Sequence, residues 1–164
     1  MIFDCHTHWS SLWNTPEAGG VPAWNAIFLT YKIRAAFVMP VQGLLSTESI
    51  HQDNEAVCSL IETSPEVTIY PLVTANPNHG PGYLEELEYW VDNRKAAGFK
   101  FHTWLQGFSL NHPGFRAVCE LAGEKRVPIF FHDGTPPFAL PEQVISLAER
   151  FPRTLFVSGH AGLL

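Results

Sequence analysis

The stretch Ile2-Phe3-Asp4-Cys5-His6-Thr7-His8-Trp9 carries two histidines directly after a short run of β-branched and aromatic side chains. Such a run predicts a β-strand. Successive side chains of a strand point to opposite faces, so Asp4, His6 and His8 are expected to share one face. Two imidazoles on one face can hold a metal ion together, although a His-x-His pair alone is also typical of surface or capping histidines.

Five more strands are predicted after this one, each separated from the next by a helical pattern. The strands are expected at 35–39, 67–73, 99–102, 129–132 and 154–160, and the helices at 23–32, 46–63, 83–97, 111–125 and 141–150. Gly98 is expected to close the third helix in the C′ position. Uninterrupted alternation with right-handed crossovers predicts a parallel α/β sheet. Without a linker or a composition shift, residues 1–164 are expected to form a single domain.

Four of the predicted strands carry histidine at or near their carboxyl ends: His6 and His8, His102, His132, and His160. In parallel α/β proteins these ends lie on one face, where active sites are found. Any one of these residues could be a hydrogen-bonded core histidine, but the joint pattern favours a shared site. The other three histidines stand in helix or turn contexts and are expected to be exposed or capping residues.

Composition excludes several classes of function. The 164 residues are 46% hydrophobic with a net charge of −6, which argues against a nucleic-acid binder with a basic surface. No apolar run approaches the roughly 20 residues needed to cross a membrane. With no charged leader or apolar signal region before the first strand, a cytoplasmic protein is expected. The three cysteines are expected to be buried, reduced thiols.

Four motifs resemble the amidohydrolase superfamily, in the amidohydrolase-related branch that includes aminocarboxymuconate-semialdehyde decarboxylase. They are Asp4-Cys5-His6-Thr7-His8, Gly98-Phe99-Lys100-Phe101-His102, Pro128-Ile129-Phe130-Phe131-His132-Asp133-Gly134 and Ser158-Gly159-His160-Ala161-Gly162. The first and last motifs are the more specific. The resemblance runs along essentially the whole chain and implies a metal-dependent, TIM-like (β/α)8 barrel.

The resemblance also implies roles for individual residues. His6, His8 and His132 would bind one divalent ion, and His160 would be catalytic, holding or deprotonating the metal-bound water. An imidazole suits that task because a divalent ion can lower the pKa of its water to about 7. Zinc is the first choice for an imidazole-rich site, and manganese, iron and cobalt stay open.

The family pattern includes one more metal ligand, an aspartate at the end of strand eight, whereas this sequence stops just after its sixth predicted strand. A complete barrel typically needs about 250 residues. We therefore expect the six N-terminal strand-helix units of a barrel, truncated after the sixth strand. The remaining wall would come from a longer chain or from another chain, which makes a homo-oligomer possible. Asp4 is a poor substitute and is expected to accept a hydrogen bond.

Lys100 is expected to share a face with His102. In other branches of the superfamily a carboxylated strand-four lysine bridges two metals, but a buried ion pair is the favoured interpretation here. His102, Trp104 and Trp9 are then expected to bind substrate. Aromatic side chains near the site would suit an aromatic or unsaturated carboxylic acid, and they would serve equally well to pack the loops.

Three functions remain open. The first is a metal-dependent hydrolase that activates a metal-bound water against the carbonyl group of a small molecule. The second is a metal-dependent, non-oxidative decarboxylase of an unsaturated or aromatic carboxylic acid. The third is a catalytically silent fragment or binding module that keeps the histidines without an active site.

Overall fold

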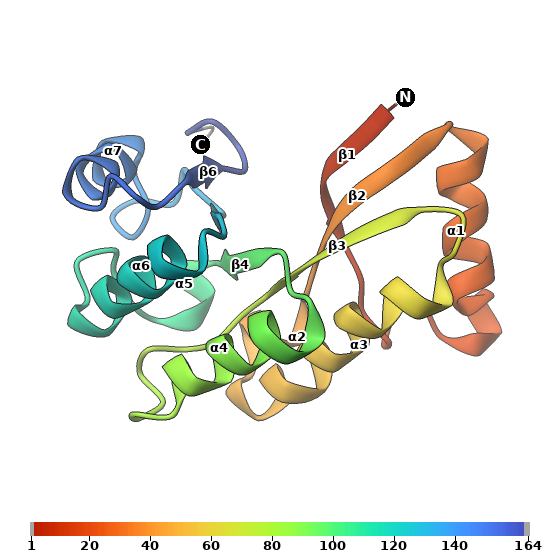
Figure 1. The fold of residues 1–164 in the computed structure, drawn as a ribbon, viewed down its shortest axis with the longest axis horizontal. Coiled ribbons are helices and arrows are strands. Elements are labelled where there is room, and N and C mark those ends of the chain that lie inside the picture. The colour runs from red at the N-terminus through yellow and green to blue at the C-terminus, as the bar shows by residue number, and fades with distance from the viewer. Residues whose placement is uncertain (1, 163–164) are drawn as a thin grey trace.

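The fold is that of a computed structural model, which describes residues 2–162 (Figure 1). Its elements are β1 (Ile2–His8), η1 (Pro16–Ala18), α1 (Gly20–Thr30), β2 (Ile33–Met39), α2 (Gln42–Leu45), η2 (Thr47–Ser49), α3 (Ile50–Thr63), β3 (Thr68–Val73), α4 (Tyr83–Arg94), β4 (Gly98–Phe101), α5 (Thr103–Gln106), α6 (Pro113–Lys125), β5 (Ile129–Phe131), α7 (Pro141–Arg150) and β6 (Phe156–Ser158). All six predicted strands and all five predicted helices are present, within a few residues of their expected bounds.

The strands form one parallel sheet in the order β1-β2-β3-β4-β5-β6. Each strand therefore lies beside its predecessor in the sequence, whereas a doubly wound sheet would reverse its direction of growth. The sheet curls, with α1, α3, α4, α6 and α7 around its outer side (Figure 1). This is part of a TIM-type barrel, as predicted, with six of the strands of the closed form.

Apolar side chains pack in two layers. The outer layer lies between the sheet and the helices, where Val57 and Leu60 of α3 and Val118 and Ala122 of α6 are buried. The inner layer lies on the concave side of the sheet, and it contains Met39, Leu72, Phe130, Phe37 and Val157. Strands buried on both faces read as continuous apolar runs, which is why β2 and β5 were recognisable in the sequence.

Gly98 does not close a helix, contrary to the sequence prediction. Helix α4 ends at Arg94, and Lys95 adopts the left-handed conformation with φ 59°. Gly98 is instead the first residue of β4, and a Cβ atom there would lie 2.7 Å from the carbonyl oxygen of Pro128. A close approach of neighbouring strands explains this glycine better than a helix cap does.

Two further expectations are wrong in detail. Cys5 is exposed on the edge strand β1, while the other two cysteines are buried as expected. The short helices α2 and α5 were not predicted, because four residues give too little periodicity to be recognised.

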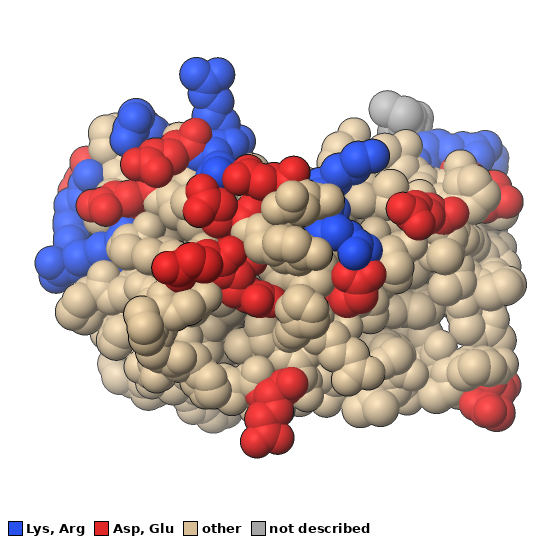
Figure 2. Space-filling view, turned by 60° about the horizontal axis from the view of Figure 1, so that its bottom comes forward, with Lys and Arg blue, Asp and Glu red and all other residues tan. Residues whose placement is uncertain are grey.

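None of the helices in residues 2–162 is long and apolar enough to span a membrane. On the face in Figure 2, Lys and Arg side chains are interspersed with Asp and Glu side chains, and its lower part is largely uncharged. That face presents no continuous basic surface for a polyanion.

The close approach at Gly98 leads to a first prediction. Gly98→Ala should lower the free energy of unfolding by about 1–3 kcal/mol, because a methyl group there overlaps the Pro128 backbone. The measurement is urea denaturation, with the unfolding transition monitored by circular dichroism. Gly82→Ala is the matched control, since its added methyl group meets no atom within 4 Å and its φ is −75°. Equal stability of the two variants would contradict the prediction.

Candidate metal centre

Five histidine side chains from four strands gather at the carboxyl ends of the sheet. The ring centroids of His6 and His8 lie 5.3 Å apart, and those of His6 and His160 lie 4.9 Å apart. His102 stacks on His132 at 3.8 Å, with 11° between the ring planes. The curl of the sheet thus brings a residue of β1 against a residue that follows β6, as the joint histidine pattern predicted.

His8 is oriented by its backbone surroundings. Its Nδ1 lies 3.2 Å from the carbonyl oxygen of Pro40, which immediately follows β2. A carbonyl oxygen can only accept, so Nδ1 carries the proton in this contact and the lone pair of a neutral His8 ring is on Nε2. Metal-binding histidines are commonly oriented by this kind of contact. His8 is therefore prepared to bind a metal through Nε2.

His132 and His160 form a pair. The Nε2 of His160 lies 3.0 Å from the Nδ1 of His132, so the Nε2 of His132 is the nitrogen left for a metal. If His132 binds metal in this way, its Nδ1–H donates to His160. His160 thus contacts His132, a predicted metal ligand, and the sequence motif did not reveal this contact.

Asp133 positions the segment that carries His160. Its carboxylate accepts hydrogen bonds from the Ser158 hydroxyl at 2.7 Å, from the His160 N–H at 2.8 Å, and from the Gly162 N–H. Burial acts to raise the pKa of Asp133, but these hydrogen bonds bring it below its ordinary value. The sequence motif contains Asp133 but predicts no role for it; its place directly after His132, a predicted metal ligand, was the available signal.

Burial favours the neutral form of four of the clustered imidazoles. Burial lowers the pKa of His8, His102 and His132 to about 4 in each case, and it also lowers the pKa of His6. Lys100 contributes electrostatically to all four shifts. Because a metal binds the neutral form of imidazole, this environment suits metal ligation at neutral pH.

The donor set fits a divalent metal in its chemistry but is not closed. Within residues 2–162, no three His, Cys, Asp or Glu side chains are arranged as a metal shell. Asp4 does not supply a missing carboxylate, since its Oδ1 accepts the backbone N–H of His6 at 3.0 Å. The expectation that Asp4 is a hydrogen-bond acceptor is confirmed, although its side chain is only partly buried.

Lys100 does not make the buried ion pair that was expected. The residue is fully buried, and its Nζ has no hydrogen-bond partner within the described part of the chain. The ammonium group lies 4.8 Å from the centroid of the Phe130 ring. Burial lowers the pKa of Lys100 to about 7, against a smaller opposing effect of Asp133.

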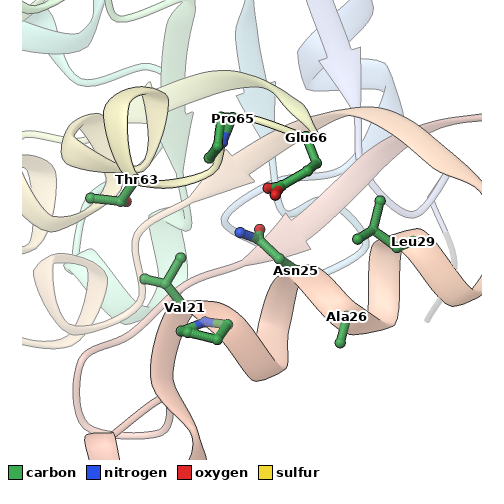
Figure 3. Close-up of a pocket in the computed structure, with 8 residues that line it drawn as sticks. Val21, Asn25, Ala26, Leu29, Thr63, Pro65 and Glu66 are labelled. Carbon is green, nitrogen blue, oxygen red and sulfur yellow. The ribbon is translucent and has the colours of Figure 1, made fainter.

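A cavity of about 250 Å³ adjoins the imidazoles, lined by His8, Trp13, Val41, Leu44, Leu45, Lys100, His102, Leu105 and His132. A larger hollow, about 360 Å³, lies between α1 and the end of α3, where Asn25 and Glu66 face each other (Figure 3). That hollow is on the outer side of the fold and holds no histidine. We therefore place the functional site at the smaller cavity.

The predicted substrate-binding residues differ in position. His102 lines the cavity, and Trp104 is exposed nearby with its ring 6.3 Å from that of His102. Trp9 is buried against Trp24 in the outer core, so its position does not support a role in substrate binding. The apolar wall comes instead from Trp13 and Leu105, and from three residues that follow β2: Val41, Leu44 and Leu45. The apolar residues Val41, Leu44 and Leu45 just after the end of a predicted strand were the available signal for the last three.

A sequential parallel sheet with helices outside and histidines at its carboxyl ends defines part of a TIM-type barrel with an imidazole-rich site. The sequence model of the amidohydrolase family matches residues 3–164. The chain belongs to this family, which confirms the resemblance drawn from its motifs. Comparison with curated protein sequences found no match.

Solved structures with the same fold include an amidohydrolase II, with a TM-score of 0.75 and 15% identity over 98% of this chain and 67% of that chain, and several decarboxylases. The chain superposes on 2,6-dihydroxybenzoate decarboxylase from Rhizobium with a TM-score of 0.72 and 13% identity, over 98% of this chain and 66% of that chain. A dihydroxybenzoic acid decarboxylase from Polaromonas sp. JS666 was solved with manganese and 2-nitroresorcinol. The chain superposes on it with a TM-score of 0.68 and 12% identity, over 98% of this chain and 65% of that chain. On 5-carboxyvanillate decarboxylase from Sphingomonas paucimobilis the chain superposes with a TM-score of 0.67 and 14% identity, over 84% of this chain and 50% of that chain. The chain thus spans between half and two thirds of their length, and at these identities the likeness concerns the fold.

The neutral imidazoles predict an acid-sensitive fold. In metal-free protein the unfolded chain binds more protons than the folded chain below pH 6.5, because His8, His102 and His132 titrate near pH 4 when folded. The free energy of unfolding should therefore fall as the pH is lowered from 7 to 5, as measured by urea denaturation. His102→Gln should reduce this slope, and His79→Gln, at an exposed position, should leave it unchanged. A slope unaffected by His102→Gln would contradict the explanation.

The unpartnered Lys100 predicts a stabilising substitution. Lys100→Met keeps most of the volume and removes a buried ammonium group, so the free energy of unfolding at pH 7 should rise by about 1–3 kcal/mol. The gain should shrink as the pH rises from 7 toward 10, because the amine of the wild-type protein is then neutral in the folded state. Destabilisation by Lys100→Met at pH 7 would show that the amine has a favourable partner.

Proposed function

We propose that this chain forms the imidazole-rich part of the active site of a metal-dependent decarboxylase, which releases carbon dioxide from a small aromatic or unsaturated carboxylic acid. The observation that supports this proposal most is the cavity beside the clustered imidazoles, which is lined by neutral histidines, a buried lysine and apolar side chains. Its setting in a fold shared with benzoate-type decarboxylases supports decarboxylation over other reactions of the family. Hydrolysis, which the motifs placed first, becomes the second candidate.

His6, His8 and His132 are the residues proposed to hold one divalent metal. Two of them have their other ring nitrogen engaged, His8 by the Pro40 carbonyl group and His132 by His160. Zinc was the expectation from the donor set, whereas the Polaromonas and Novosphingobium decarboxylases were solved with manganese. The proposal is therefore a divalent ion, with manganese and zinc as the metals to test. When bound, such an ion would stabilise negative charge that develops on the substrate.

The residues of this chain supply binding and proton transfer. Trp13, Leu44 and Leu105 would hold the apolar body of the acid and exclude water. The bond between the carboxyl carbon and the neighbouring carbon breaks, carbon dioxide leaves, and the electron pair stays on the neighbouring carbon. A proton must then be delivered to that carbon, and we assign this transfer to His160, with His102 in contact with substrate.

The second candidate is hydrolysis of a small carbonyl compound. The description of the family as amidohydrolases supports this candidate. The same residues would serve it, with the Nε2 of His160 leaving its contact with His132 to accept a proton from the attacking water, instead of His160 delivering a proton to carbon. The two reactions differ in product, carbon dioxide against an alcohol or amine, so a product assay separates them.

Metal content and activity test the proposal together. Purified protein supplied with manganese or zinc should hold about one ion per chain by elemental analysis, and His8→Ala should weaken binding by at least about 100-fold. The matched control is His79→Ala, an exposed histidine outside the cluster. With metal bound, 2,6-dihydroxybenzoate and related acids should release carbon dioxide, and a chelator should abolish the release.

Three outcomes would overturn parts of this proposal. Carbon dioxide release that survives metal removal would refute metal dependence. Cleavage of esters or amides with no release of carbon dioxide would establish the hydrolase instead. A chain that takes up no metal when it is offered would support the silent binding module.

A further inference from the structure

The cavity beside the histidines is lined by one buried lysine and by no acidic side chain of residues 2–162. It is lined by Lys100 and three imidazoles, together with Trp13, Leu44, Leu105 and two further aliphatic side chains. Among the residues of 2–162 that line it, none carries a carboxylate. A cation buried in such a place is stabilised only when an anion comes from elsewhere.

Asp133 is the acidic residue that acts electrostatically on Lys100, but its carboxylate oxygens are already occupied by other hydrogen bonds. Both of its oxygens accept hydrogen bonds from the segment 158–162. The Nζ of Lys100 lies instead over the Phe130 ring, and no residue in the described range 2–162 accepts a hydrogen bond from it. An ammonium group has three hydrogens to donate, and no acceptor in residues 2–162 engages any of them, although Lys100 lines the cavity.

The shape of the cavity adds a second constraint. Its volume, about 250 Å³, lies just below the range of roughly 300–1,000 Å³ typical of small-molecule sites, so the ligand must be small. Its lining combines a buried lysine and imidazoles with apolar side chains. A fitting ligand therefore combines a flat apolar body with a negative group at one end.

We propose that Lys100 is the carboxylate-binding residue of this site, and that the site selects amphipathic organic anions over uncharged molecules of the same shape. This inference rests on the proposed function, because it assumes that the cavity beside the imidazoles is the active site. In the occupied site, the carboxylate of the substrate would supply the negative charge that compensates the Lys100 ammonium group. When the acid binds, the Lys100 ammonium group would donate a charge-assisted hydrogen bond to its carboxylate.

The assignment also separates the two candidate reactions by substrate class. A neutral ester or amide would leave the Lys100 ammonium group without an acceptor for its charge. An organic acid would satisfy it, and this acid is the substrate that decarboxylation requires. The buried lysine thus adds a specificity determinant to a site whose sequence motifs are dominated by histidine.

Equilibrium binding of two probes tests the inference. Benzoate and benzamide have nearly the same shape and differ in charge, and their affinities for chelator-treated protein are measured by isothermal titration calorimetry at pH 6. This pH keeps Lys100 protonated, since burial lowers its pKa only to about 7. The wild-type protein should prefer benzoate by at least about tenfold.

Substitution of Lys100 should remove that preference. Lys100→Met and Lys100→Gln should each lower benzoate affinity at least about tenfold and change benzamide affinity less than about twofold. Lys95→Met is the matched control, because it removes one positive charge at an exposed position and should leave both affinities unchanged. Circular dichroism of each variant confirms that it is folded.

The inference fails if benzoate binds Lys100→Met as tightly as wild type, if benzamide binds wild type as tightly as benzoate, or if neither probe binds at millimolar concentration. Metal content of the same samples distinguishes this failure from that of the proposed function. A chain that binds no metal but prefers benzoate through Lys100 contradicts the metalloenzyme and supports the anion site. A chain that binds metal but shows no such preference contradicts the anion site alone.

Discussion

Sequential pairing of parallel strands is the constraint on which the site depends. Because each strand lies beside its predecessor and the sheet curls, the ring of His6 on β1 comes within 4.9 Å of the ring of His160 after β6. Gly159 makes this approach possible, since a Cβ atom there would lie 2.6 Å from the Phe131 carbonyl oxygen and 3.2 Å from His6. A larger residue would push apart the two ends of the sheet that share the imidazole cluster.

Removal of water from the concave side of the sheet sets the chemistry of the cluster. Burial disfavours charge on imidazole and on the lysine amine alike. It lowers the pKa of His8 and His132 to about 4 and that of Lys100 to about 7, so at pH 6 these imidazoles are neutral while the lysine is still protonated. The neutral imidazoles are proposed to bind a metal, and the buried lysine is proposed to bind an anion. The same physical effect therefore prepares two different functions on adjacent side chains.

Stability and function are coupled through Asp133. Its carboxylate ties Ser158, His160 and Gly162 together, so the segment after β6 has a defined path although β6 is only three residues long. His160 in turn contacts His132, whose other ring nitrogen is proposed as a metal ligand. A buried acidic residue outside the cavity lining thus positions two of the imidazoles, as outer residues of metal sites commonly do.

The sequence by itself determined the strand–helix alternation and the histidines at the strand ends, because these follow from local periodicity and from residue types at element boundaries. It also carried the motifs of the amidohydrolase family, which the family match confirms. Only the tertiary structure decided that Trp9 packs in the outer core, that Gly98 begins a strand beside Pro128, and that Lys100 has no partner in residues 2–162. Burial and pairing of these side chains depend on residues distant in the sequence, and no local pattern records which distant group comes within contact distance.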